Sequence, residues 1–252
     1  MIPNDDISKF DHPRVTNFSL QREKAIKLEE EIYTGVGFKV YEDLHIFDVP
    51  IEFRGKQEFV HTSRCGDEND DVLVLVHGYG GNGIAFVKML KDLSKRFKVY
   101  CVDLLGLGLS SRPKFEDDNA EASIDYFLDG FEGWRKALNI EKFVLGGHSM
   151  GAYLSGLYAA KVPTRVEKLY MFSPPGMTED KDKRPHEEKI NDLGFFRRQF
   201  AKLGVNFFNK KQIHTEFKQN YPRLFNWWLS GYVKYRLKIK GKDGDLIKDF
   251  FQ

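Results

Sequence analysis

Short apolar runs alternate with stretches of helical character between residues 72 and 172. The apolar runs predict strands at 72–76, 98–102, 143–145 and 166–172, and the intervening stretches predict helices at 84–95, 123–138 and 151–161. Strands joined through helices of this length run parallel, with right-handed crossovers. The run 72–76 is apolar on both faces, which is typical of a strand covered by helices on both sides. The pattern therefore predicts an α/β fold with a mostly parallel sheet flanked by helices.

The two ends of the chain have different patterns. Residues 20–32 are rich in Glu, Lys and Leu and predict a helix, while residues 37–62 alternate loosely and predict two or three short strands or a hairpin. After Pro174-Pro175-Gly176, apolar residues recur at helical spacing. We expect three parts: residues 1–70 as the N-terminal helix and first strands, 71–178 as the central parallel core, and 179–252 as a helical cap or lid.

Composition fits a folded domain without a membrane span. The 252 residues are 41% hydrophobic and include 22 Phe and 11 Tyr, which excludes a disordered chain. No apolar run is long enough to cross a bilayer, and the acidic N-terminus lacks the features of a secretory signal or transit peptide. Two cysteines, Cys65 and Cys101, cannot form a multi-bridge framework, so a reducing compartment is favoured. We expect a protein that is cytoplasmic or peripheral on an intracellular membrane, and not secreted.

Charge is distributed unevenly. Residues 181–252 carry 17 basic and 8 acidic side chains, whereas residues 1–180 carry 22 basic and 29 acidic ones. A basic segment that is also rich in aromatic residues can contact anionic surfaces, so residues 190–252 are a candidate contact with a membrane or lipid droplet. An ordinary amphipathic helix with a solvated basic face explains the same composition. Nucleic acid is not expected as a partner, because no nucleic-acid-binding signature is present.

A G-x-S-x-G pentapeptide lies between a predicted strand and a predicted helix, as Gly147-His148-Ser149-Met150-Gly151. A sharp strand-to-helix turn presents its serine to solvent, and glycines on either side avoid collisions with the neighbouring strand and helix. The N-terminus of the following helix offers free N–H groups and a positive dipole end, which favour an oxyanion. The pattern therefore predicts Ser149 as a nucleophile; the alternative is a glycine-rich turn with an inert serine.

A second glycine-rich loop, His77-Gly78-Tyr79-Gly80-Gly81, follows the first predicted parallel strand. It allows the backbone N–H of Tyr79 to join that of Met150 as a pair of oxyanion donors. We expect His77 to shape the loop rather than to move protons. The Lys and Ser/Thr that a phosphate-binding P-loop requires are absent.

The next predicted strand leads into the loop Asp103–Pro113. Its Gly-x-Gly lacks the third glycine and the directly following helix of a dinucleotide site. We expect a loop beside the mouth of the active site, with Asp103 as a structural carboxylate.

Together these stretches resemble the α/β-hydrolase fold. More narrowly, the chain resembles the branch that contains N-acyl-phosphatidylethanolamine lipase, the cardiolipin-specific deacylase and the lysophosphatidic-acid acyltransferase-like coactivator of triglyceride lipase. The matching stretches are Val76–Gly81, Asp103–Gly106, Ser110–Phe115, Phe131–Arg135, Gly147–Gly151 and Arg165–Leu169. The resemblance implies Ser149 as nucleophile, Tyr79 and Met150 as oxyanion donors, and a lipid acyl ester or amide as substrate. Leu109 stands where this branch leads us to expect a basic residue, which puts a headgroup contact in doubt.

The acid and histidine of a Ser–Asp/Glu–His triad are not recognisable in the sequence. In this fold they follow the cap, after further strands, whereas here the chain ends inside the predicted cap. The histidines that follow Ser149 in the sequence are His186 and His214, and both lie in the predicted cap. Because a serine hydroxyl is a weak nucleophile without a base, we expect a lipid serine hydrolase whose remaining triad is supplied outside this sequence. The alternatives are a catalytically inactive module that docks on a membrane or protein, and a base recruited from the cap.

Two further expectations follow from the missing strands and from ligand spacing. The strand at 166–172 would form an unpaired apolar edge that a partner chain could cover. No cofactor or metal is expected, since no His/Cys/carboxylate cluster has ligand spacing.

Overall fold

The computed structural model describes residues 20–115 and 119–176, together with residues 188, 191–192 and 223. The chain divides into two compact units, residues 1–176 and 177–252. All named helices and strands belong to the first unit. The predicted cap helices between 179 and 252 lie outside the described residues, apart from isolated positions.

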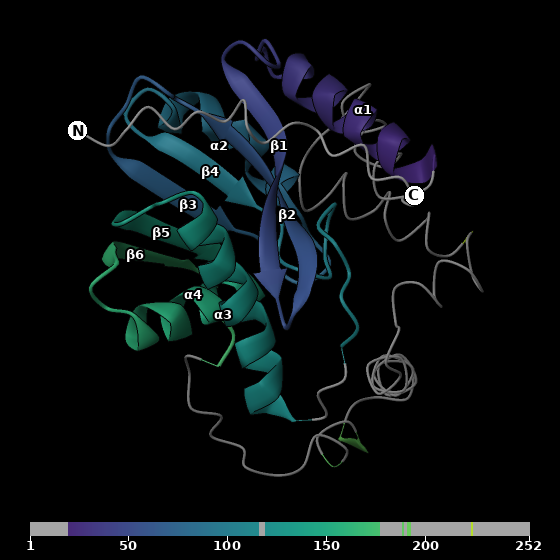
Figure 1. Cartoon of the computed structure of the whole chain (residues 1–252), viewed down its shortest axis with the longest axis vertical. Helices are drawn as coiled ribbons and strands as arrows, with labels where there is room; N and C mark the ends of the chain where they lie inside the picture. Colours follow the sequence, from purple (N-terminus) through teal and green to yellow (C-terminus); the bar gives the residue numbers. More distant parts are fainter. Residues whose placement is uncertain (1–19, 116–118, 177–187, 189–190, 193–222, 224–252) are drawn as a thin grey trace. The chain divides into compact units, whose positions relative to one another are not determined.

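Within the described residues, six strands form one sheet in the order β1-β2-β4-β3-β5-β6 (Figure 1). The strands are β1 (Leu44–Phe53), β2 (Lys56–Cys65), β3 (Val72–Val76), β4 (Lys98–Val102), β5 (Phe143–His148) and β6 (Val166–Phe172). The helices are α1 (Leu20–Gly35), η2 (Gly83–Phe86), α2 (Val87–Leu93), α3 (Ala120–Ala137) and α4 (Met150–Lys161). β1, β2 and β4 pair antiparallel, and β4, β3, β5 and β6 pair parallel.

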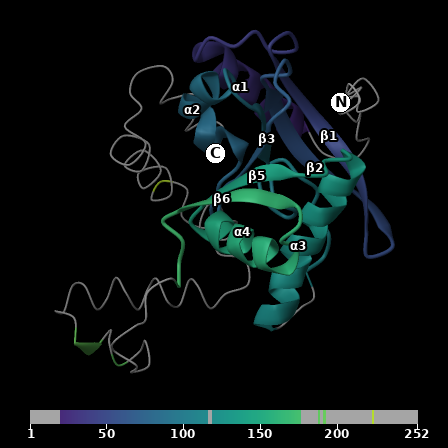
Figure 2. The ribbon, with the colours of Figure 1, turned by 90° about the vertical axis from the view of Figure 1, so that its left-hand side faces the viewer.

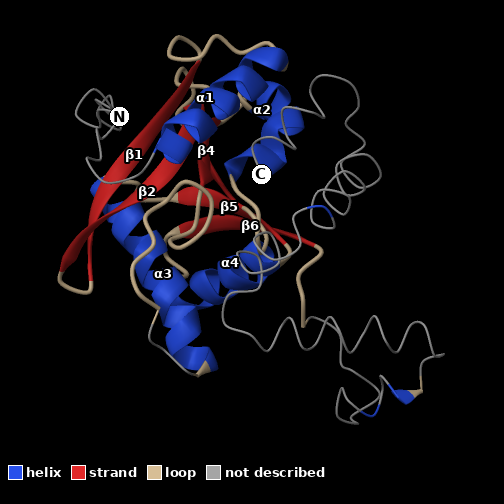
Figure 3. Ribbon diagram, turned by 90° about the vertical axis from the view of Figure 1, so that its right-hand side faces the viewer, coloured by secondary structure: helices blue, strands red, loops and turns tan. Residues whose placement is uncertain are grey.

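Helices cover both faces of this sheet. Figures 2 and 3, seen from opposite sides, show α1 and α2 over one face and α3 and α4 over the other. All five residues of β3 are buried, as its two-sided apolar pattern predicts. The predicted α/β class, with a mostly parallel sheet flanked by helices, is confirmed.

Most predicted elements lie where the sequence places them, and the differences have local causes. The strands expected in 37–62 form a hairpin of two ten-residue strands that runs from Leu44 to Cys65, so it begins and ends later than predicted. The helix predicted from residue 84 begins as the short 3₁₀ turn η2, at whose start the Asn82 side chain accepts a hydrogen bond from the N–H of Ile84 at 3.2 Å. β5 extends to His148, directly before the candidate serine.

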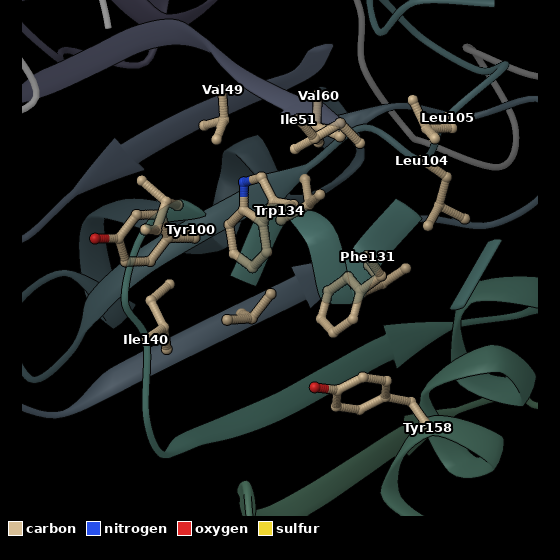
Figure 4. Close-up of a cluster of buried hydrophobic side chains, with 14 of the residues drawn as sticks. Val49, Ile51, Val60, Tyr100, Leu104, Leu105, Phe131, Trp134, Ile140 and Tyr158 are labelled. Carbon is tan, nitrogen blue, oxygen red and sulfur yellow. The ribbon is translucent and has the colours of Figure 1, made fainter. Parts of the chain in front are cut away.

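The core between the sheet and α3 is centred on Trp134 (Figure 4). Its ring is fully buried, lies edge-to-face with Tyr100 at 5.7 Å, and donates from Nε1 to Thr62 Oγ1 at 2.9 Å. Two residues before Trp134, Glu132 accepts a hydrogen bond of 2.6 Å from the Tyr158 hydroxyl of α4. These contacts fix α3 on the sheet and tie to it the helix that follows the candidate serine.

β6 is the last strand of the sheet within the described part of the chain. Its residues are intermediate or exposed, and Tyr170 and Phe172 are 51% and 44% exposed. The edge is not uniformly apolar, since Glu167 and Lys168 are exposed on it too. Among the described helices, none has the length and apolar character needed to cross a membrane.

Candidate active site

Four loops leave the same edge of the sheet, where the parallel strands end. His77, Asp103, Ser149 and Ser173 come directly after β3, β4, β5 and β6 respectively. Ligand sites of open α/β sheets form outside the carboxyl ends of their strands. The candidate residues of three sequence motifs therefore meet at the edge where this architecture places a site.

Ser149 occupies a strained turn between β5 and α4. Its φ of 53° and ψ of −122° lie in a region that non-glycine residues rarely adopt. The surrounding structure holds this conformation: the Ser149 N–H donates to the carbonyl of Phe172 at 2.9 Å, and its own carbonyl accepts from the N–H of Tyr153 at 3.1 Å. The side chain is half-buried at the start of α4. Ser149 is thus presented at the carboxyl edge by a rigid backbone.

Three glycines make room for this turn. A Cβ on Gly147 would lie 2.5 Å from the carbonyl oxygen of Gly151, and one on Gly151 would collide with the carbonyl oxygens of Val76 and His77. A Cβ on Gly78 would lie 3.1 Å from Cβ of Ser149. The close approach of β3, its loop and the turn therefore depends on glycine at these positions.

His77 is fully buried and both of its ring nitrogens have hydrogen-bond partners. Nδ1 lies 2.8 Å from the carbonyl oxygen of Gly78, and Nε2 accepts from the N–H of Leu104 at 3.1 Å. These contacts place the proton on Nδ1 and leave the imidazole ring neutral. Burial lowers the pKa of His77 against the opposing effects of Asp103 and the Gly78 carbonyl. His77 thereby joins its own loop to the loop after β4.

The Asp103 carboxylate organises that second loop. Oδ1 accepts from the N–H of Gly83 at 2.6 Å, and Oδ2 accepts from the N–H of Leu109 at 2.8 Å. Gly108 has a φ of 53°, and a Cβ there would collide with the same carboxylate. A buried carboxylate with both oxygens bonded to backbone N–H groups holds loops together.

Two backbone N–H groups are the predicted oxyanion donors. Met150 is the first residue of α4, and N–H groups in the first turn of a helix have no acceptor within that helix. Tyr79 follows Gly78, the residue against which Ser149 packs, and its side chain is 50% exposed. Both residues therefore belong to segments that flank Ser149.

A histidine that could activate Ser149 is not among the described contacts. In residues 20–115 and 119–176, no histidine is hydrogen-bonded to the Ser149 hydroxyl. His148 precedes the serine and is exposed, while His45 lies 3.6 Å from the Asp67 carboxylate. His186 and His214 lie outside the described residues.

Residues 71–233 match the family described as alpha/beta hydrolase fold. The chain belongs to this family. This α/β-hydrolase is 41% identical over 114 residues to a probable 1-acylglycerol-3-phosphate O-acyltransferase of Oryza sativa subsp. japonica. The match covers 45% of the chain and 28% of that protein. It is 35% identical over 168 residues to the human 1-acylglycerol-3-phosphate O-acyltransferase ABHD5. That match covers 62% of the chain and 48% of the human protein. The resemblance to the acyltransferase-like branch is thereby confirmed.

The α/β-hydrolase chain spans less than half the length of these two relatives. Among solved structures, naproxen esterase from Bacillus subtilis is similar, with a TM-score of 0.59 and 16% identity over 93% of this chain and 69% of the esterase. At that identity the likeness concerns the fold alone.

Sequence reasoning missed one group of buried charges in this α/β-hydrolase. Arg22 and Glu29 from α1, Asp48 from β1 and His61 from β2 are at most 9% exposed and contact one another. We call them the α1 charge cluster. The available signal was weak: Asp48 interrupts the apolar run of β1, but His61 lies in a largely polar strand, and their pairing depends on the hairpin register.

Replacing Ser149 with glycine is expected to raise the free energy of unfolding by about 1–2 kcal/mol, because glycine adopts the strained dihedral angles of this turn at little cost. Ser149→Ala keeps the Cβ and should leave stability nearly unchanged. Denaturant unfolding of both variants measures the difference. A glycine variant no more stable than the alanine variant would show that the turn stores no such strain.

Proposed function

We propose that this protein is a serine hydrolase that acts on acyl ester or amide bonds of lipids, including phospholipids, with Ser149 as the nucleophile. The observation that carries the proposal is the backbone of Ser149, held at a φ of 53° between β5 and α4 at the carboxyl edge of the sheet. The substrate class is supported by the names of the relatives, which are acyltransferases of 1-acylglycerol-3-phosphate.

The chemistry follows from the elements around the serine. The Ser149 hydroxyl oxygen attacks the substrate carbonyl carbon, and its proton passes to a general base. The N–H groups of Tyr79 and Met150 donate to the oxyanion that develops, and the N-terminal end of α4 stabilises its charge. Collapse of the tetrahedral intermediate breaks the bond to the leaving group, which takes a proton, and leaves an acyl-enzyme. Water or an acceptor alcohol then releases the acyl group.

The base and its carboxylate partner are proposed to come from outside the described residues. Two described histidines are already engaged: both ring nitrogens of His77 have partners, and His61 is buried between two carboxylates. The outer side of β6, the last strand of the sheet in the described residues, is a suitable place for further strands, from the same polypeptide or from a partner chain. Contact with a membrane or lipid droplet would use residues 190–252, of which the structure describes only residues 191–192 and 223.

A fluorophosphonate probe tests the nucleophile directly. We expect covalent labelling at Ser149 in the complete protein, with its base present, and no labelling of Ser149→Ala in the same background, since the probe requires an activated hydroxyl. Ser94→Ala, which changes a serine whose hydroxyl donates to the carbonyl of Lys91 at the protein surface, is the matched control and should label like the wild type. Labelling that persists in Ser149→Ala would contradict the assignment.

A catalytically inactive docking module is the second candidate. It is favoured by the lack of a histidine bonded to the Ser149 hydroxyl within the described ranges. For this candidate the probe experiment would give no label on folded protein. Salt-sensitive binding to anionic vesicles that survives Ser149→Ala would then support docking as the function.

A further inference from the structure

The α1 charge cluster joins a helix to a hairpin through buried ionisable groups. Asp48 and His61 lie directly opposite each other in the β1–β2 register, with Asp48 Oδ1 2.6 Å from His61 Nδ1. From α1, Glu29 Oε2 lies 2.8 Å from His61 Nε2, and Arg22 Nη2 donates to Asp48 Oδ2 at 2.6 Å. His61 is therefore held between carboxylates at both ring nitrogens.

This arrangement requires a proton that a neutral imidazole and two carboxylates lack. A neutral ring has one N–H, so one of the two carboxylates would face a lone pair. One added proton, on Nε2 or on the Glu29 carboxyl, allows both contacts to be hydrogen bonds. With it, the positive charges of the cluster balance the negative ones; without it, a net negative charge is buried.

The direction of each pKa agrees with retention of that proton. Burial alone lowers the pKa of His61, but Glu29 and Asp48 together hold it well above its ordinary value. Burial raises the pKa of Glu29 against the opposing effect of His61, and Asp103 and Asp48 raise it further. Among the groups around Glu29 and His61, the buried Tyr33 hydroxyl and Cys101 thiol have pKa values well above their ordinary ones and stay neutral.

The cluster also contacts the loop after β4. Arg22 Nε donates to the carbonyl of Leu109 at 3.2 Å, and the N–H of Leu109 donates in turn to the Asp103 carboxylate. His61 itself accepts from the N–H of Asp103 at 3.0 Å through its carbonyl, and its N–H donates to the Ser110 hydroxyl at 2.8 Å. Through Asp103 and His77 this loop is bonded to the loop after β3, whose Gly78 lies next to Ser149.

We propose that the α1 charge cluster is a proton-dependent latch: the proton shared by Glu29 and His61 holds α1 against the sheet, and Arg22 thereby steadies the loop of residues 103–111 beside the candidate active site. The latch is independent of whether Ser149 reacts, because all its contacts lie within α1, the hairpin and this loop.

The sign of the pH dependence follows from the raised pKa of His61. The docked state binds one proton more than the open state at any pH between the ordinary value, about 6.5, and the higher value in the docked state. The stabilisation that this proton contributes to docking is therefore fully present below about pH 6.5 and is lost as the pH rises through that interval. Within it, the equilibrium constant for opening should rise up to about tenfold per pH unit.

Hydrogen exchange of the full chain, corrected for the intrinsic exchange rate, tests the latch. Between about pH 6.5 and 9, we expect protection of residues 20–35 and 103–111 to fall together by up to about tenfold per pH unit, while α3 stays protected. In Glu29→Gln the new amide can donate to a neutral ring, so no extra proton is required and the slope should flatten. Glu31→Gln, the same change at an exposed position of α1, is the matched control and should keep the wild-type slope.

Each outcome decides a part of the proposal. A wild-type slope no steeper for α1 than for α3 would overturn it without recourse to any variant. If the protection of α1 falls with pH but that of residues 103–111 does not, the coupling to the loop is overturned. If Glu29→Gln and Glu31→Gln show the same pH dependence of protection, the role of the shared proton is overturned. Fluorophosphonate labelling is a separate readout, so failure of the latch and failure of the proposed nucleophile are distinguishable.

Discussion

Gly151→Ala is expected to lower the free energy of unfolding by about 3 kcal/mol or more, or to prevent folding, because the backbone around Gly151 leaves no space for the added methyl group. It would collide with the carbonyl oxygens of Val76 and His77, at the end of the fully buried strand β3. Backbone in a central strand cannot move without breaking the pairing of β3 with β4 and β5. Thermal or denaturant unfolding measures the loss.

Gly156→Ala is the matched control for this effect. It makes the same change in the same helix, but the new Cβ meets only the end of the Met171 side chain, with the terminal methyl group at 2.9 Å and the sulfur at 3.5 Å. A flexible side chain can turn away, and alanine favours a helix interior over glycine by up to about 1 kcal/mol. We therefore expect Gly156→Ala to be neutral or slightly stabilising. Similar losses of stability in the two variants would refute the view that backbone contacts fix the turn between β5 and α4.

Asp48→Asn is expected to destabilise the protein by about 3 kcal/mol near pH 6, because it removes the buried negative charge that pairs with the Arg22 guanidinium and accepts from His61 Nδ1. Asp48 is 2% exposed and contacts both Arg22 and His61. The amide has the same shape as the carboxyl group, so packing is retained and the loss reports on charge. Denaturant unfolding of both proteins gives the difference.

The difference between wild type and Asp48→Asn should shrink in acid. Burial alone would raise the pKa of Asp48, but His61 and Arg22 hold it below the ordinary value. Its contribution is therefore present above about pH 4 and is lost as the pH falls through the lower pKa of the folded state. Asp92→Asn, which breaks an exposed ion pair with Lys95, should change stability little at either pH. If the difference in stability between wild type and Asp48→Asn is unchanged in acid, the carboxylate charge is not its cause.

Local pattern was sufficient to predict most of the sheet. The strands 72–76, 98–102 and 166–172 are confirmed at the predicted residues, because each is a short apolar or β-forming run bounded by turn residues. The position of Ser149 between a strand and a helix is confirmed for the same reason. The hairpin β1–β2 was predicted only loosely, since its register depends on contacts between residues far apart in the chain.

The sequence by itself determined the fold class and the motif that brackets Ser149, because apolar period and glycine spacing are local properties. It did not determine the partners of the charged residues. Arg22, Glu29, Asp48 and His61 are spread over forty positions and read individually as ordinary polar residues. Only the tertiary structure decided that they share one buried site, since the hairpin register places Asp48 against His61 and the packing of α1 brings a positive and a negative charge to them. Buried charges become coupled through distance and loss of water, and neither is a property of local sequence.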